Sequence, residues 1–380
     1  MELLAQSYVY GLQQKARTVQ GDIKVVYLLG WFLSYFALLL WYLGARNRII
    51  FVAIFFSYLA TIIVIRYSGT DTYPIYELLL RDLLNNVPNE LMQGLEPGFA
   101  LLSKAFLWLT NSEVWTVRGI GVVFVTLLLI YLFRADRTEL LLLFLYFIPV
   151  LVYQYGMNAI RAGLGLALVL LAWQALRRNR WVLFALLSLM SLLFHYSVAL
   201  VLTFLMLFEI SLKNWRVVAL VCIFLIVVAS IFASRLDYFE SKLLLYSNYD
   251  SPTEISGLSR LALVGLLWLS FAISDSPLRS KVKTFTMLVL PAVGFQLLAT
   301  IFYAGLRFLE LFTFFVPLVL IREYDRHCRN PSKVFWLGMA VSGLLGAAFL
   351  YRNFLTDFDG QLTGTPTPFL PFRTIFDYKP

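Results

Sequence analysis

Residues 49–65 read IIFVAIFFSYLATIIVI, a run of 17 residues without a charged side chain. This length is close to what an α-helix needs to cross a hydrocarbon layer of roughly 30 Å. The run ends at RYSGTDTYPIYELL, residues 66–79, where charged and aromatic side chains replace the short polar filler of an ordinary membrane loop. The stretch therefore predicts a membrane-spanning helix that leads into a polar segment with a function beyond connecting two spans.

Apolar runs of this kind recur along the whole chain. Of the 380 residues, 60% are hydrophobic and only 14% are charged, which does not fit a soluble core with a polar surface. The bilayer core offers no water to hydrogen-bond with the backbone. A helix satisfies its backbone polar groups within the span itself. We therefore predict an all-α fold, a polytopic integral membrane helix bundle with about 12 transmembrane helices. The predicted spans are 25–43, 49–65, 119–133, 140–155, 160–176, 181–194, 197–209, 217–232, 260–274, 284–303, 306–321 and 334–350.

The predicted spans make one transmembrane domain, residues 25–350, with a segment at each end. Residues 1–24 are too polar for a signal peptide but could form an interfacial helix. Residues 351–380 contain TGTPTPFLPF, which predicts turns and extended chain rather than helix. The apolar stretch 97–110 is short for a span and predicts a re-entrant or surface helix, with a true crossing as the alternative. The pair 181–209 is short for two full crossings and predicts a tight hairpin with the HYS sequence, 195–197, at its tip.

Basic residues between the spans predict the orientation. They lie in ARNR at 45–48, RADR at 134–137, RRNR at 177–180, Lys213 with Arg216, RSKVK at 279–283 and REYDRHCR at 322–329. The predicted cytoplasmic loops that contain these sequences hold 16 Lys and Arg against 6 Asp and Glu, whereas the rest of the chain holds 15 against 16. By the positive-inside rule they face the cytoplasm, which places loops 66–118 and 233–259 and the tail 351–380 on the opposite side. The net charge of +9 is thus explained by topology and does not indicate a nucleic-acid partner.

Several classes of chemistry lack a signature in this sequence. Cys222 and Cys328 form no disulfide framework, and His195 and His327, the two histidines of the sequence, do not predict a metal site. Glycine-rich phosphate loops and a Gly-x-Ser-x-Gly nucleophile elbow are also absent from the sequence. We therefore predict no cofactor, and the motif pattern does not favour nucleotide-driven chemistry.

A few ionisable residues lie next to apolar spans on the non-cytoplasmic side, where charges are expensive. They are Arg66, Asp71, Arg161, His195, Arg307 and Glu310. A single arginine in such a place could simply extend to the interface, and Arg307 with Glu310 could be an i,i+3 ion pair. The clustering of arginines with a histidine on one side is what indicates a site. Guanidinium groups bind phosphate through two hydrogen bonds and stay charged, so a pyrophosphate lipid head group fits as the ligand.

Aromatic residues on the same side allow two interpretations. They are typical of the belt that marks a membrane interface, and they could also stack on sugar rings. The candidate sugar-binding residues are Tyr73, Tyr76, Tyr196, Tyr303 and Glu310.

The order of short motifs resembles one known family. It comprises R-x-x-G-T-D-x-Y-x-x-Y from Arg66 to Tyr76, EPGF at 96–99, IRAGLG at 160–165, FHYS at 194–197 and GLRF at 305–308. Together, over about residues 25–350, they resemble the EpsG family of Wzy-type polysaccharide polymerases, which make O-antigen or exopolysaccharide. The resemblance implies a GT-C-like polymerase/ligase architecture in the bacterial inner membrane, with the active site facing the periplasm.

The resemblance implies a glycosyltransferase that uses no nucleotide sugar. Its donor and acceptor would both be glycans linked to a polyprenyl pyrophosphate such as undecaprenyl pyrophosphate. Its other partners would be membrane lipids, a chain-length regulator and the flippase of the same pathway. Arg161, Arg307 and Arg66 would bind pyrophosphate. The base that takes the proton of the attacking sugar hydroxyl would be His195, with Asp71 and Glu96 as alternatives.

Two other functions remain compatible with the sequence. A lipid-linked oligosaccharide flippase or transporter would also span the membrane many times, but it typically carries charges near the midplane and inverted repeats. A noncatalytic partner of an envelope-assembly complex is the second alternative.

Overall fold

The computed structural model describes residues 25–43, 48–69, 76–85, 95–209, 215–236, 240, 257–274, 276–355, 367, 369–370 and 372–377. These residues are mostly helical, with one isolated β-bridge between Arg66 and Thr374. Two compact units divide the chain. The first unit comprises Met1–Leu164 and Ala347–Pro380, and the second unit comprises Gly165–Gly346.

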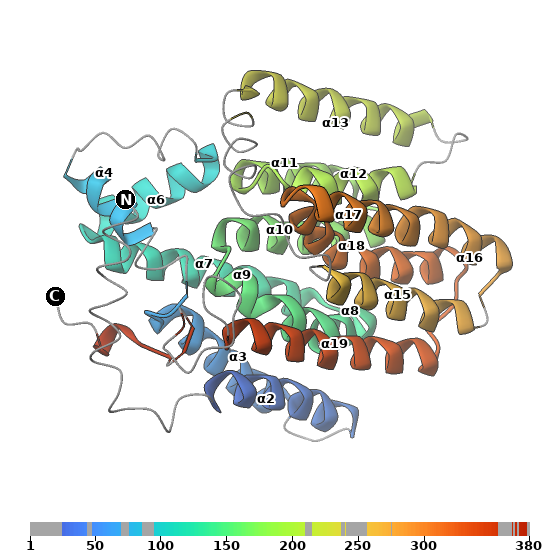
Figure 1. The fold of residues 1–380 in the computed structure, drawn as a ribbon, viewed down its shortest axis with the longest axis horizontal. Coiled ribbons are helices and arrows are strands. Elements are labelled where there is room, and N and C mark those ends of the chain that lie inside the picture. Colours follow the sequence, from blue (N-terminus) through green and yellow to red (C-terminus); the bar gives the residue numbers. More distant parts are fainter. Residues whose placement is uncertain are drawn as a thin grey trace. The chain divides into compact units, whose positions relative to one another are not determined.

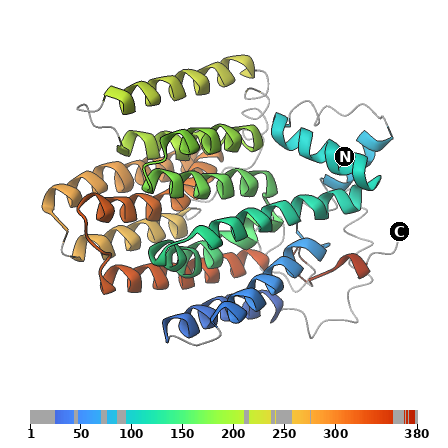
Figure 2. The ribbon, with the colours of Figure 1, turned by 180° about the vertical axis from the view of Figure 1, so that it is seen from behind.

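The first unit is built around α3 and α7. Its helices are α2 (Val25–Tyr42), α3 (Arg48–Ile65), α4 (Leu78–Leu84), α6 (Pro97–Thr110), α7 (Glu113–Arg134), α8 (Arg137–Leu142), the π-helical segment η3 (Leu143–Val152), α9 (Tyr153–Met157), the start of α10 (Ile160–Arg177), the end of α19 (Lys333–Phe354) and the short 3₁₀ helix η5 (Ile375–Asp377). Figures 1 and 2 show α2 and α7 beside α3, and α6 beside α7. The Ser112 side chain accepts a hydrogen bond from the Trp115 amide, which caps α7 at its first turn.

The second unit is built around α18. Its helices are the rest of α10, α11 (Trp181–Phe194), α12 (Val198–Glu209), α13 (Trp215–Ser234), α15 (Leu258–Ile273), α16 (Leu278–Thr284), the π-helical segment η4 (Phe285–Val289), α17 (Leu290–Ile301), α18 (Ala304–Arg326) and most of α19. The central helix α18 packs against α12, α15 and α17 (Figure 1). Most of its side chains are buried.

The structure confirms a polytopic helical membrane protein. Within the described residues, six helical segments are long and apolar enough to cross a membrane: Glu113–Arg134, Arg137–Met157, Ile160–Arg177, Leu278–Ile301, Ala304–Arg326 and Lys333–Phe354. Six further helices contain apolar stretches of 10–17 residues in the described part of the chain. Each of the twelve predicted ranges thus coincides with a helix, whereas the count of twelve crossings and the GT-C-like architecture stay predictions.

The observed helix boundaries change some of the sequence predictions and confirm others. The helix predicted over 119–133 begins at Glu113, because Ser112 caps it. The basic sequence RSKVK at 279–283 lies inside α16 rather than in a loop. The polar segment 66–118 contains α4 and α6, and α6 covers 97–110 as predicted. The predicted hairpin at 181–209 is α11 and α12 joined by residues 195–197.

The described part of the C-terminal tail returns to the polar end of α3. The Tyr67 amide donates to the Arg373 carbonyl at 2.7 Å, and the Arg373 amide donates to the Ser68 hydroxyl at 2.7 Å. The ring of Phe369 stacks on that of Phe354 at a centroid distance of 4.4 Å. The tail therefore forms part of the first unit next to the motif that begins at Arg66.

Candidate functional site

Arg161 lies at the centre of a polar cluster in the first unit. Its Nη1 donates to Glu96 Oε2 at 2.8 Å, and its Nε donates to the Tyr76 hydroxyl at 2.7 Å. Glu96 is fully buried, whereas the Arg161 side chain is 21% exposed. Two partners therefore hold the guanidinium in one orientation, while part of the Arg161 side chain stays exposed.

The local sequence explains how Glu96 reaches Arg161. Proline is favoured at the first position of a helix, and Pro97 begins α6 directly after Glu96. The carboxylate of Glu96 makes no capping hydrogen bond to that helix, which leaves it directed at the arginine. Tyr76 is buried, and its ring packs against that of Phe99, in the first turn of α6, at 5.3 Å.

Arg66 and Gly69, from the same motif, occupy the turn that follows α3. Arg66 is 2% exposed, and its Nη1 donates to the Ile63 carbonyl, so the cation lies at the C-terminal end of α3, where a helix favours positive charge. Gly69 has a φ of 103°, and a Cβ there would lie 2.5 Å from the Met157 carbonyl oxygen. The glycine thus lets the chain pass close to the end of α9, just before Arg161 in sequence.

A second buried ion pair lies in the same unit. Arg118 Nη1 contacts Glu77 Oε1, and Arg118 Nη2 donates to the Arg66 carbonyl at 2.9 Å. The sequence analysis missed Arg118 because it placed the start of this span at residue 119. Ser112 followed by Glu113 is a helix-start signal that could have extended the helix over Arg118.

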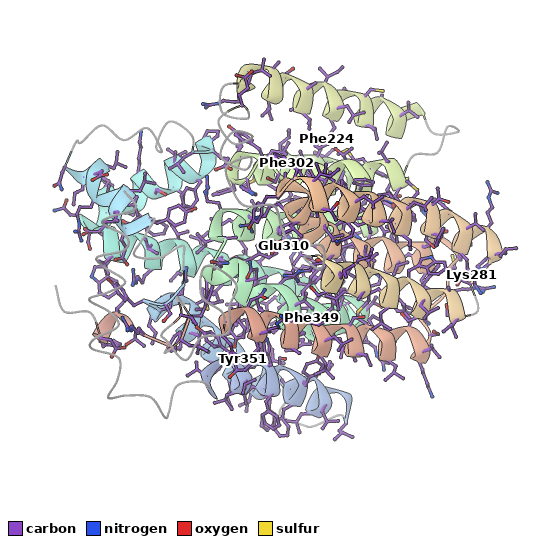
Figure 3. All side chains as sticks on the ribbon, viewed as in Figure 1. Phe224, Lys281, Phe302, Glu310, Phe349 and Tyr351 are labelled. Atoms are coloured by element: carbon purple, nitrogen blue, oxygen red, sulfur yellow. The ribbon has the colours of Figure 1, made fainter. Side chains whose placement is uncertain are left out.

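Arg307 belongs to a cluster in the second unit. Its Nη1 lies 3.3 Å from Glu310 Oε2, which is the predicted i,i+3 pair, and its guanidinium lies 5.6 Å from the centre of the Tyr303 ring. Glu310, labelled in Figure 3, is almost fully buried, and the Arg307 side chain is 45% exposed. Arg260 Nη2 lies 4.0 Å from Glu310 Oε1. Two guanidinium groups therefore share one carboxylate and leave the cluster positively charged.

The turn before Arg307 is compact because of a glycine. A Cβ at Gly305 would lie 2.3 Å from the Ala299 amide nitrogen, so only glycine allows α17 and α18 to meet so closely. Arg260 and Arg307 each lie in the first turn of their helices, α15 and α18, which pack together. Helix N-termini attract anions, so both helices add to the positive potential of the arginines. Arg260 was missed because it stood at the edge of a predicted span.

His195 and Tyr196 form the turn between α11 and α12. The His195 amide donates to the Ser191 carbonyl at 3.1 Å, and the His195 carbonyl accepts from the Val198 amide at 3.2 Å. The histidine is half-buried and Tyr196 is buried. The turn holds the imidazole at the end of α11, as the predicted hairpin requires. Asp71 and Tyr73 lie outside the described residues.

The structure therefore separates the predicted site residues into groups. Arg161, Glu96 and Tyr76 contact one another in the first unit, with Arg66 in the same unit. Arg307, Glu310 and Tyr303 contact one another in the second unit, and His195 and Tyr196 lie in a different turn of it.

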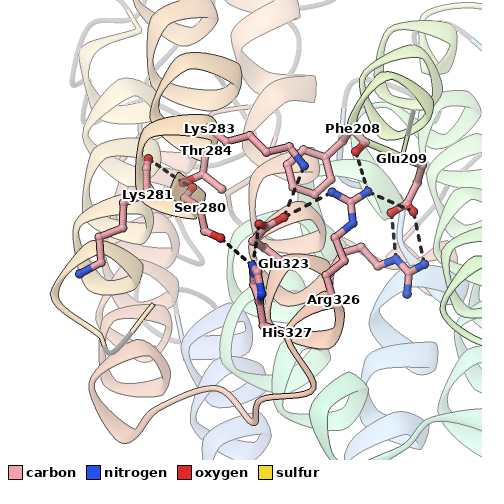
Figure 4. Close-up of polar contacts among 10 residues, drawn as sticks. Phe208, Glu209, Ser280, Lys281, Lys283, Thr284, Glu323, Arg326 and His327 are labelled. Atoms are coloured by element: carbon pink, nitrogen blue, oxygen red, sulfur yellow. Dashed lines mark hydrogen bonds and ion pairs between the residues drawn. The ribbon is translucent and has the colours of Figure 1, made fainter. Parts of the chain in front are cut away.

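The opposite ends of the second unit's helices carry a network of ion pairs (Figure 4). Glu209 accepts hydrogen bonds from Arg322 Nε at 2.8 Å and Nη2 at 3.3 Å, and its Oε2 also lies 3.1 Å from Arg326. Glu323 lies 3.3 Å from Arg326 and 3.6 Å from Lys283. The network joins α12, α16 and α18. Lys283, Arg322, Glu323 and Arg326 come from segments predicted to face the cytoplasm, and Glu209 ends the span predicted over 197–209.

One part of this network contains a serine, a histidine and a glutamate. The Ser280 hydroxyl lies 2.7 Å from His327 Nε2, and Glu323 Oε1 lies 3.3 Å from the same nitrogen. A nucleophile relay needs the hydroxyl and the carboxylate on different ring nitrogens. The arrangement is therefore suited to holding helices together and not to activating the serine.

We expect Glu209→Gln to lower the free energy of unfolding by about 1.5–3 kcal/mol, the range for hydrogen bonds to charged groups. The amide keeps the shape of the side chain but leaves Arg322 and Arg326 without their shared anion. Thermal or denaturant unfolding of the purified protein in detergent measures the change. Lys281→Gln is the control, because Figure 4 shows Lys281 on α16 pointing away from the network. A Glu209→Gln protein as stable as the wild type would show that these pairs give no net stabilisation.

Within the described part of the chain, no three His, Cys, Asp or Glu side chains lie close enough to hold a metal ion. The partly exposed charged side chains of the two clusters are Arg161 and Arg307, and a guanidinium group is able to bind phosphate oxygens directly.

Comparison with known families gives a single assignment. The model of the EpsG family matches residues 49–360, which covers most of the chain and all five motifs described above. Comparisons with curated proteins and with solved structures found no significant match.

Proposed function

The chain belongs to the EpsG family, a family of Wzy-like polymerases, and from this membership we propose a specific reaction. The protein is a membrane glycosyltransferase that polymerises polyprenyl-pyrophosphate-linked oligosaccharide repeat units into a surface polysaccharide. It lies in the bacterial inner membrane with about 12 crossings in a GT-C-like arrangement, and its active site faces the periplasm. Its partners are the two lipid-linked glycans, membrane lipids, and the chain-length regulator and flippase of the same pathway.

The observation that carries the proposal is the Arg161 cluster. An arginine next to apolar spans is expensive unless it is paired or serves a ligand. Here the buried Glu96 and the Tyr76 hydroxyl orient the guanidinium, while 21% of the side chain stays exposed. This combination of fixed orientation and partial exposure is what a phosphate-binding arginine needs.

The proposed reaction exchanges one C–O bond for another. A hydroxyl oxygen of the acceptor sugar attacks the anomeric carbon of the donor glycan. The bond from that carbon to the pyrophosphate breaks, and the polyprenyl pyrophosphate leaves with the electron pair. The hydroxyl proton passes to a base of the protein. Negative charge grows on the pyrophosphate during this step, so guanidinium groups that contact it stabilise the transition state.

We assign pyrophosphate binding to Arg161, Arg307 and Arg66. Arg307 is supported by its exposure, by the nearby Arg260 and by the N-termini of α15 and α18. Arg66 is more deeply buried and donates to its own helix, so its assignment rests on its place in the family motif.

The base in this proposal is His195, with Asp71 and Glu96 as alternatives. The half-buried His195 lies at the tip of a helical hairpin, and an imidazole is the side chain that most often serves as a general base. Glu96 is already paired with Arg161, which supports an orienting role for it. Sugar binding is assigned to Tyr73, Tyr76, Tyr196, Tyr303 and Glu310.

The proposal is tested with the purified full-length protein and one synthetic lipid-linked repeat unit. We expect a ladder of longer lipid-linked glycans to form without any nucleotide sugar. Release of polyprenyl pyrophosphate should equal the number of glycosidic bonds formed. Unchanged substrate after incubation with folded protein would contradict the proposal. Movement of the lipid across liposome bilayers without lengthening of the glycan would identify a flippase instead.

A further inference from the structure

The Arg118–Glu77 ion pair joins three segments of the first unit. Arg118, on α7, contacts the Glu77 carboxylate and also donates to the Val114 carbonyl at 3.1 Å and to the Arg66 carbonyl at 2.9 Å. Glu77 directly follows Tyr76, whose hydroxyl accepts a hydrogen bond from Arg161. One guanidinium therefore fixes both the end of α3 and the segment that carries the partner of Arg161.

Stability alone gives a poor account of this pair. Its side chains are 3% and 0% exposed, and removing two charges from water costs as much as their attraction returns, or more. Moreover, Glu77 Oε2 and Arg118 Nε are buried without a hydrogen-bond partner among the described residues. A buried polar atom without a hydrogen-bond partner destabilises the folded protein. A pair kept at this cost is more consistent with a geometric role.

The backbone around Arg66 supports this view. On one side Arg118 holds the Arg66 carbonyl, and on the other side the Tyr67 and Ser68 amides donate to the Arg373 carbonyl at 2.7 and 3.3 Å. The turn after α3 is thus fixed by α7 and by the C-terminal tail, directly before the Gly-Thr-Asp sequence of the motif at 69–71.

We propose that Arg118 and Glu77 are positioning residues for the reaction. They touch no substrate themselves. They hold Tyr76 so that it orients Arg161, and they hold the turn at Arg66. This inference rests on the proposed function, because Arg161 is taken to bind pyrophosphate.

The test compares three variants of the full-length protein. The double variant Arg118→Gln with Glu77→Gln removes both charges together and leaves no unbalanced buried charge. Arg118→Lys keeps the charge but loses the planar group that reaches two segments at once. Glu113→Gln is the matched control, because Arg81 Nε pairs with Glu113 at 3.0 Å and that pair also joins α4 to α7. Among the described residues, the Glu113 carboxylate makes no hydrogen bond to Arg66 or Tyr76.

We expect both Arg118 variants to lower kcat by about 10²-fold, as small misplacements of a catalytic group do, while KM stays near the wild-type value. Melting temperatures in detergent should stay near that of the control. Hydrogen exchange at the Tyr67 and Ser68 amides and in α4 should become faster, since their anchor is lost. Glu113→Gln should keep the wild-type kcat.

Three results would overturn the proposal. The first is a wild-type kcat in the double variant. The second is a wild-type kcat in Arg118→Lys, because Arg118 would then serve only to balance the charge of Glu77. The third is a loss of activity that is proportional to the loss of folded protein, both in the Arg118 variants and in the Glu113→Gln control. If the wild type makes no polymer, the proposed function fails, and hydrogen exchange alone then decides whether Arg118 and Glu77 hold the two segments.

Discussion

Replacing Arg161 by lysine is expected to lower the rate of polymer formation by about 10²- to 10³-fold, the usual cost of losing one preorganised donor to a developing negative charge. Lysine keeps the positive charge, but its single nitrogen cannot replace the two separate nitrogens, Nε and Nη1, that reach Tyr76 and Glu96 in the planar guanidinium. The rate is measured as polyprenyl pyrophosphate released per folded enzyme, with the lipid-linked repeat unit in excess.

The control for this prediction is Arg81→Lys in the same unit. Arg81 also pairs with a glutamate, at 3.0 Å, but it is more exposed and lies outside the Arg161 cluster. Its substitution should leave the rate unchanged. An Arg161→Lys enzyme with the wild-type rate would show that Arg161 serves packing or charge balance only.

Glu96→Gln separates the two roles of Glu96 in the same assay. A glutamine oxygen can still accept the hydrogen bond from Arg161, so an orienting role predicts a smaller loss than that of Arg161→Lys. A base cannot be replaced by an amide, so a loss of about 10²- to 10⁴-fold would move the proton-accepting role from His195 to Glu96.

Replacing His195 by alanine is expected to lower kcat by about 10²- to 10⁴-fold, the contribution of a general base. Binding of the lipid-linked substrate should be retained, because His195 lies in a turn of the second unit and is assigned no pyrophosphate contact. The measurements are single-turnover rates and equilibrium binding of the labelled repeat unit.

The neighbouring Ser197→Ala is the control, since it changes the same exposed turn without removing a proton acceptor. His195→Gln tests a purely hydrogen-bonding role. If the glutamine variant keeps the wild-type kcat, His195 supports the turn only, and Asp71 or Glu96 becomes the better candidate for the base.

The sequence by itself determined the class of the protein and the positions of its helices. A run such as 49–65 has no stable alternative to a helix in a bilayer, because each backbone group must find its partner within the run. The same local reasoning predicted the hairpin at 195–197, the helix at 97–110 and the i,i+3 pair of Arg307 with Glu310. The family motifs were also readable, since short segments carry them.

Only the tertiary structure decided which charges meet. Glu96 and Arg161 are 65 residues apart, and Glu77 and Arg118 are 41 residues apart. Their pairing depends on how each helix is rotated and packed against its neighbours. In these helices apolar side chains cover nearly all faces, so periodicity does not mark the side that faces another helix. For the same reason the sequence could not show that Arg66 folds back onto α3, or that Arg118 holds the two segments around Arg161.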